Sequence, residues 1–129
     1  MSSDKTRDIV RGYLDGHATG QLADDAVFTM MGTNTVVRGR ENIGAMLAGF
    51  YHGVFEAHAE ERHLLVGDGW AVLEADVVGE LRSQLGDIAP SERQVTVPLC
   101  VVYEVDDDAI TGARIYLETD RLRGETETS

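Results

Sequence analysis

Three side chains that could carry acid–base chemistry alternate in the last part of the chain. Arg114, Tyr116 and Glu118 lie two residues apart in a strand predicted over residues 109–118, so they should share one face of it. A carboxyl group at the mouth of an apolar cavity has a raised pKa and can donate or accept a proton. Alternatively, Arg114 and Glu118 form a solvated pair that contributes little to stability. The choice depends on whether this face points into a cavity.

Glu74 and Asp76 alternate in the same way within a strand predicted over residues 70–82. The opposite set is wholly apolar and should face the core: Leu73, Ala75, Val77 and Leu81. Glu74 and Asp76 are then expected on the outer face, in solvent or at a subunit contact. An inverted register would instead bury both carboxylates beside a cavity.

The other residues with ligand or nucleophile chemistry do not form a recognisable pattern. The four histidines lack the spacing of a metal site, with His52 and His58 six residues apart across a predicted helix end. Cys100 has no basic neighbour in the sequence and belongs to a valine-rich strand, so we interpret it as a small buried residue. We expect neither a metal nor another cofactor, and we expect Met30, Phe50 and Cys100 to line a cavity.

Length and composition restrict what the chain can be. It has 129 residues, 43% of them hydrophobic and 26% charged, which is typical of one globular domain over residues 1–129. The formal charge of −12 argues against nucleic-acid backbones and anionic membrane surfaces as partners. A single cysteine, with no signal or membrane-spanning segment, predicts a cytoplasmic protein. The polar residues 1–4 and 124–129 are expected to be disordered.

Two amphipathic helices are predicted in the first half of the chain. Apolar residues at helical spacing mark one over residues 5–17 and another over residues 41–55. Between them, residues 26–31 form a short apolar stretch that is rich in strand-forming residues. This half of the chain therefore supplies helices that can pack against a sheet.

The second half of the chain changes to a period of two. Strands are predicted over residues 56–66, 70–82, 94–105 and 109–118, with turn-forming residues between them. Strands this long must twist and coil, and the two helices can fill the concave side. The predicted fold is α+β: a cone-shaped barrel in which a strongly curved antiparallel sheet wraps around the N-terminal helices. Such a cone has more interior than two helices fill, which predicts a hydrophobic cavity.

Five segments, through their order and spacing, resemble the nuclear transport factor 2-like superfamily, particularly its branch of SnoaL-like polyketide cyclases and ketosteroid isomerases. The segments are LADDAVF at 22–28, VRGRENI at 37–43, VGDGWAV at 66–72, VPLCVVY at 97–103 and ITGARIY at 110–116. The resemblance implies the cone-shaped fold and a homodimer formed through the outer face of the sheet. It does not imply one reaction, because this fold hosts isomerases, cyclases, hydrolases and binding proteins.

The resemblance allows two reactions of this superfamily to be tested residue by residue. Ketosteroid isomerases carry a tyrosine on the first helix, which Tyr13 matches, but Met30 and Cys100 occupy the positions of their two acids. Methionine cannot abstract a proton, so ketosteroid isomerase chemistry is disfavoured. Epoxide hydrolase chemistry is also disfavoured, because Ala75 and Val77 stand where that reaction needs an arginine and an aspartate.

The last predicted strand resembles the corresponding segment of the SnoaL-like cyclases, in which an acidic residue stands two positions after an aromatic one. In this sequence Glu118 stands two positions after Tyr116. This resemblance implies a cofactor-independent enzyme that cyclises or isomerises a small apolar molecule in the cavity. Glu118 would be the acid/base, Tyr13 or Tyr116 would stabilise an oxyanion, and Arg114 would orient Glu118. The alternative is a non-catalytic module of the same fold that binds a ligand or a partner.

Overall fold

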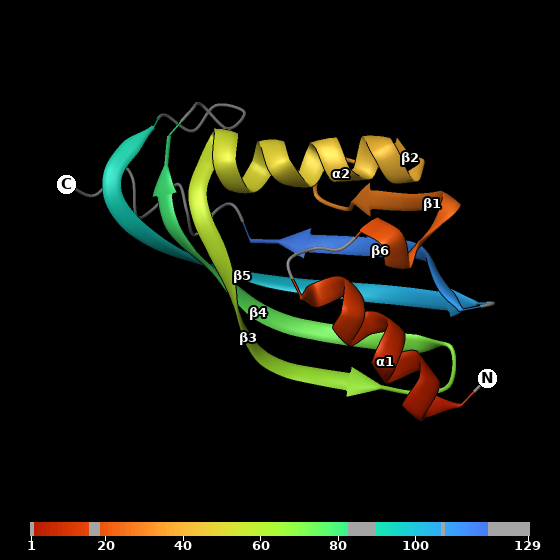
Figure 1. Cartoon of the computed structure of the whole chain (residues 1–129). Helices are drawn as coiled ribbons and strands as arrows, with labels where there is room; N and C mark the ends of the chain where they lie inside the picture. Colours follow the sequence, from red (N-terminus) through yellow and green to blue (C-terminus); the bar gives the residue numbers. More distant parts are fainter. Residues whose placement is uncertain (1, 16–18, 83–89, 107, 119–129) are drawn as a thin grey trace.

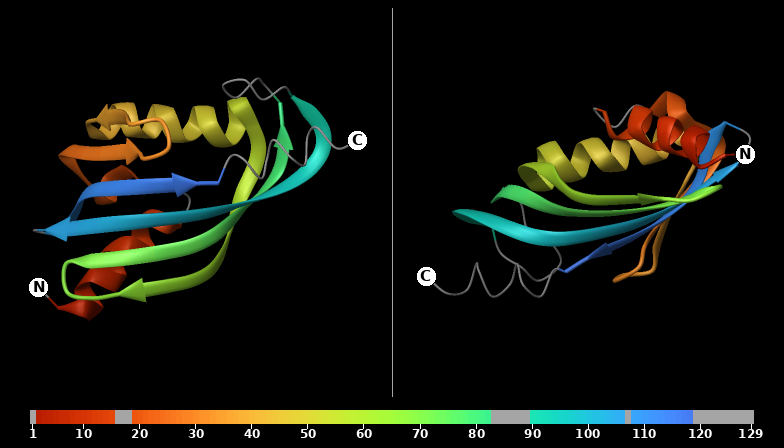
Figure 2. Two further views of the ribbon diagram at one scale, coloured as in Figure 1. Left: turned by 180° about the vertical axis from the view of Figure 1, so that it is seen from behind. Right: turned by 90° about the horizontal axis from the view of Figure 1, so that it is seen from below.

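The computed structural model describes residues 2–15, 19–82, 90–106 and 108–118. Two helices cover the concave face of a curved six-stranded sheet, which Figure 1 and Figure 2 show from three directions. The helical elements are α1 (Ser3–Leu14), η1 (Thr19–Gln21), α2 (Arg40–Gly49) and the π-helical turn η2 (Phe50–Val54). The strands are β1 (Leu22–Met30), β2 (Thr35–Arg38), β3 (Phe55–Val66), β4 (Trp70–Leu81), β5 (Ser91–Asp106) and β6 (Ala109–Leu117).

The sheet has the strand order β2-β1-β6-β5-β4-β3. β1 runs parallel to β6, while the other neighbouring pairs are antiparallel, so the sheet is mixed. In the described part of the chain the edge strands β2 and β3 do not pair, and the sheet stays open. The long strands β3, β4 and β5 supply the curvature. The predicted α+β cone architecture is therefore confirmed, with one parallel pair in its sheet.

Some element boundaries differ from those that the sequence predicts. The second predicted helix, over residues 41–55, is divided: α2 ends at Gly49 and the wider turn η2 follows it. The sequence does not predict β2, because its four residues are too few to show a period. Disorder was expected over residues 1–4, whereas α1 begins at Ser3. Residues 124–129, which carry the same expectation, lie outside the described residues.

A buried threonine fixes α1 to the turn between β3 and β4. The Oγ1 of Thr6 donates a hydrogen bond to the carbonyl of Ser2 at 3.0 Å and accepts one from the backbone N–H of Gly69, also at 3.0 Å. Thr6 has no exposed surface. Gly69 has a φ of 84°, a conformation that favours glycine, and its carbonyl accepts a bond from the N–H of Val105. The first turn of α1 is thereby held against β4 and β5.

Replacing Thr6 by Val should lower the free energy of unfolding by about 1 to 3 kcal/mol, because the Gly69 N–H then loses its acceptor. Urea denaturation measures this loss. The matched control is Thr111→Val, which removes an exposed hydroxyl that donates to the Glu104 carbonyl at 3.3 Å. Its effect should stay within about 0.5 kcal/mol. Equal losses in the two variants would show that the Thr6 bond does not fix α1.

Candidate functional site

A cavity of about 530 Å³ lies on the concave side of the sheet, beneath the two helices. Alternation along the strands produces its wall, since every second residue of β4 and β5 points inward. The apolar lining comes from elements throughout the fold and includes Phe28, Met30, Met46, Leu47, Phe50, Leu73, Ala75, Leu99, Val101, Ile115 and Leu117. A molecule in this cavity would meet a predominantly hydrocarbon surface.

Three tyrosines bring hydroxyl groups into this apolar lining. Tyr13 comes from α1, Tyr51 from η2 and Tyr103 from β5, and all three are buried. The Tyr13 ring packs edge-to-face against Tyr103, with 5.8 Å between ring centroids, and against Phe28 at 6.1 Å. Three elements that are far apart in the sequence thus converge on one phenol cluster, which we define as Tyr13, Tyr51 and Tyr103.

Burial keeps the phenol cluster protonated. Desolvation raises the pKa of Tyr51 to about 12. It raises the pKa values of Tyr13 and Tyr103 further, and repulsion between the phenols adds to this effect. All three groups therefore stay neutral phenols at physiological pH, able to donate a hydrogen bond to a ligand oxygen and to accept one from a ligand N–H. They are poor proton acceptors.

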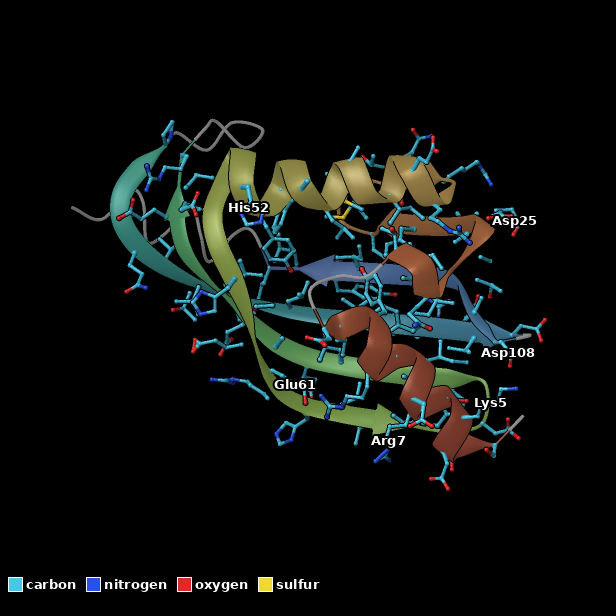
Figure 3. All side chains as sticks on the ribbon, viewed as in Figure 1. Lys5, Arg7, Asp25, His52, Glu61 and Asp108 are labelled. Carbon is cyan, nitrogen blue, oxygen red and sulfur yellow. The ribbon has the colours of Figure 1, made fainter. Side chains whose placement is uncertain are left out.

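The rim of the cavity carries the remaining polar groups. His52 lies in η2, which follows α2, and His58 and Glu61 come from β3; Figure 3 labels His52 and Glu61. The Nη1 of Arg11 on α1 donates to the Oε1 of Glu61 at 2.6 Å. Among the described residues that line the cavity, Glu61 is the sole carboxylate, and neither lysine nor arginine is present.

Three of the residues proposed from the sequence lie at this cavity. Tyr13, Met30 and Phe50 line it, where the sequence analysis expected them. The face of β4 is also as predicted, with Leu73 buried and Glu74 exposed. The register of this strand therefore directs its carboxylates away from the cavity.

The structure places Tyr116, Glu118 and Cys100 elsewhere. All three line a groove of about 540 Å³ on the convex face, together with Glu74 and Asp76. Ile115 and Leu117 line the cavity, so alternation sends their neighbours Tyr116 and Glu118 to the opposite side. Cys100 faces outward for the same reason, between Leu99 and Val101. The expectation that these residues reach the cavity is therefore corrected.

Arg114 does not orient Glu118 as expected. Its Nη1 donates instead to Oε1 of Glu104 at 3.2 Å, across the β5–β6 pair on the exposed side. This is a surface ion pair, of the kind that contributes little to stability. The alternative that the sequence left open, a solvated pair of Arg114 with Glu118, is therefore right about the exposed side but wrong about the partner, which is Glu104.

Tyr51 and Tyr103 of the phenol cluster and the rim carboxylate Glu61 are not among the site residues predicted from the sequence. A signal existed for the phenols: Tyr51 belongs to the apolar stripe of the second predicted helix, and Tyr103 shares a face with the valines of its strand. Glu61 had no such signal. It alternates with Ala57 and Ala59, which also line the cavity, but the register shift between Glu61 and His63 puts it out of phase with the apolar Leu64, and bulges of this kind are not visible in a hydrophobic pattern.

Within the described residues, clusters of metal ligands and membrane-spanning helices are both absent. No three side chains of the His, Cys, Asp and Glu types lie together in a way that could hold a metal ion. No helix in the described ranges combines the length and the hydropathy that a membrane span requires.

The family model of the SnoaL-like domain matches residues 10–113 of this sequence. The chain belongs to the SnoaL-like family. No curated protein matches the sequence. The family assignment agrees with the resemblance carried by the five segments, and the matched residues include the end of α1, the whole of α2, the phenol cluster and most of the sheet.

Solved structures support the same fold. A candidate SnoaL-like polyketide cyclase from Jannaschia sp. is 14% identical with a TM-score of 0.83, covering 98% of this chain and 94% of that one. A hypothetical protein from Catenulispora acidiphila with a ketosteroid isomerase-like fold, in complex with trimethylamine, is 14% identical with a TM-score of 0.77. That match covers 95% of this chain and 94% of the other. At such identities the likeness shows the fold alone.

The phenol cluster predicts a pH dependence of stability. Folding raises the pKa values of the cluster above the unfolded value of about 10, so the unfolded chain loses these protons first. The stabilisation is fully present below that pH and is lost as the pH rises towards 12. Urea denaturation across this range should show the loss, and Tyr51→Phe should reduce it. Tyrosinate absorbance appearing near pH 10 from all three residues in a folded protein would contradict this assignment.

Proposed function

We propose that the protein binds a small, largely apolar molecule in the concave cavity and holds the polar group of that molecule against the phenol cluster. The observation that carries the proposal is the convergence of three protonated, buried phenols in an otherwise apolar lining. The volume of about 530 Å³ is within the range of small-molecule sites. Apolar surface then supplies affinity, and the hydroxyl groups supply orientation.

We further propose proton-transfer chemistry of the cyclisation or isomerisation type, without a cofactor, as a second function of this cavity. The observation that favours it is the pairing of phenol donors in the interior with titratable groups on the rim, His52, His58 and Glu61. A phenol such as Tyr13 would stabilise an oxyanion on the ligand, and a rim group would accept the proton. Glu118 has no part in this proposal, because it lines the groove on the other face.

We also propose that the protein acts in the cytoplasm as a homodimer that buries the convex face of its sheet. That face exposes Trp70 and Tyr116, at 47% and 45% of their surface, and Leu65 at 56%. Covering these side chains would remove large apolar surfaces from water. The dimer would leave the cavity mouth on the concave side accessible to a ligand.

Binding of Prodan, a neutral fluorescent naphthyl ketone, tests the proposed ligand site. A blue shift on titration should report transfer of the dye into an apolar cavity. Tyr51→Phe should weaken binding by about threefold to tenfold, because one hydroxyl donor is lost. Met46→Trp should abolish binding, because the indole fills the cavity.

Two variants of the convex groove are the matched controls for this titration. Met31→Trp and Glu118→Gln alter residues that line only the outer groove, so Prodan affinity should stay unchanged. If Met31→Trp abolished binding while Met46→Trp did not, the ligand site would lie on the convex face and the proposal would be wrong.

Exchange of the protons beside the carbonyl of 2-tetralone in D₂O tests the proton-transfer function. In this step a C–H bond breaks, the proton passes to a rim group, and the electron pair forms an enolate whose oxygen the phenols hold. The rim group exchanges its proton with D₂O and returns a deuteron to the carbon, which restores the ketone. NMR should show faster exchange with the protein than without it. Tyr13→Phe should slow exchange by about tenfold to a hundredfold, whereas Glu118→Gln should have no effect. Prodan binding without any accelerated exchange would establish a binding protein instead.

A further inference from the structure

We propose that the natural ligand of the cavity carries a positively charged nitrogen, so that the site selects alkylammonium compounds over neutral or anionic molecules of the same shape. This inference rests on the proposed ligand site and adds the charge of the ligand to it. It follows from the charges that line the cavity, from the chemistry of its neutral polar groups and from the charge of the whole chain.

The charged groups at the cavity are arranged to favour a cation. Among the described lining residues Glu61 is the one carboxylate, and there is no lysine or arginine that could meet an anion. The guanidinium of Arg11 does not line the cavity and donates to Glu61 at 2.6 Å. An anionic ligand in the apolar interior would therefore lose its hydration without gaining a lysine or arginine partner, since the basic groups that line the cavity, His52 and His58, are exposed on its rim. A cation near the rim would share the Glu61 carboxylate with Arg11.

The neutral groups of the site also suit a cation. Phe50 and Tyr51 form an edge-to-face pair in η2, with 5.1 Å between ring centroids and an interplanar angle of 87°. Phe50 is half-buried and lines the cavity, and the face of an aromatic ring attracts an ammonium group. The phenol oxygens of Tyr13, Tyr51 and Tyr103 can accept hydrogen bonds from an ammonium N–H. Interior and rim thus present electron-rich groups to the ligand.

The whole chain reinforces this local preference. The formal charge of −12 creates a negative potential around the molecule, which raises the local concentration of cations and repels anions. A cavity open to solvent on a surface of this sign meets cationic ligands more often. Local contacts and long-range potential therefore favour the same ligand charge.

Displacement of Prodan by three compounds of one shape tests the inference. Phenyltrimethylammonium, tert-butylbenzene and benzenesulfonate each carry a tetrahedral group on a benzene ring, with charges of about +1, 0 and −1 at neutral pH. The cation should displace Prodan at a concentration at least about tenfold lower than the neutral compound, and the sulfonate should displace it least. Glu61→Gln and Phe50→Leu should each raise the concentration of the cation that is needed to displace Prodan. The concentration of tert-butylbenzene that is needed should change by no more than about twofold.

Glu118→Gln is the matched control for Glu61→Gln, since it removes one negative charge from the convex groove and the same amount of net charge. It should leave the preference for the cation in place. Equal displacement by the three compounds, or strongest displacement by the sulfonate, would overturn the inference while the ligand site stands. Failure of Prodan itself to bind would overturn the ligand site and this inference together.

Discussion

Alternation of side chains along the long curved strands is the constraint on which the rest of this structure depends. In β4, β5 and β6 one set of residues lines the concave face and the other set lines the convex face. The concave set is apolar apart from the phenol of Tyr103. The convex set carries ion pairs such as Arg62 with Asp76 at 2.7 Å. The sheet therefore separates two chemical environments, and only the apolar residues Ala75, Leu99 and Leu117 among the described ones line both the cavity and the groove.

The helical elements complete the concave environment. Tyr13 and Tyr51 lie on α1 and η2, so the phenol cluster exists only when both are seated on the sheet. Thr6 fixes the start of α1 to the β3–β4 turn. Arg40 fixes the start of α2, since its guanidinium donates to the carbonyl of Leu22 at 2.9 Å and pairs with Asp24 at the same distance. Local polar bonds at the helix starts thus position hydroxyl groups deep in the cavity.

The architecture could be predicted from the sequence because long alternating strands and amphipathic helices leave clear periods. The polar set of the last strand could not be assigned to one face of the sheet from its own alternation alone. Alternation shows that Tyr116 and Glu118 share a face, but it does not show which face is concave. The apolar partners Ile115 and Leu117 contained that information, as the partners of Glu74 did in β4. Tyr116 and Glu118, which the chemistry of their side chains suggests as site residues, are the residues that this apolar pattern directs outward.

The most direct test of the concave ligand site uses the methionines as reporters of its position. Met30 and Met46 line the cavity, whereas the adjacent Met31 lines the convex groove. With ¹³C-labelled methionine methyl groups, titration of Prodan should shift the resonances of Met30 and Met46 and leave that of Met31 in place. A shift of Met31 alone would place the ligand on the convex face and contradict this account of the protein.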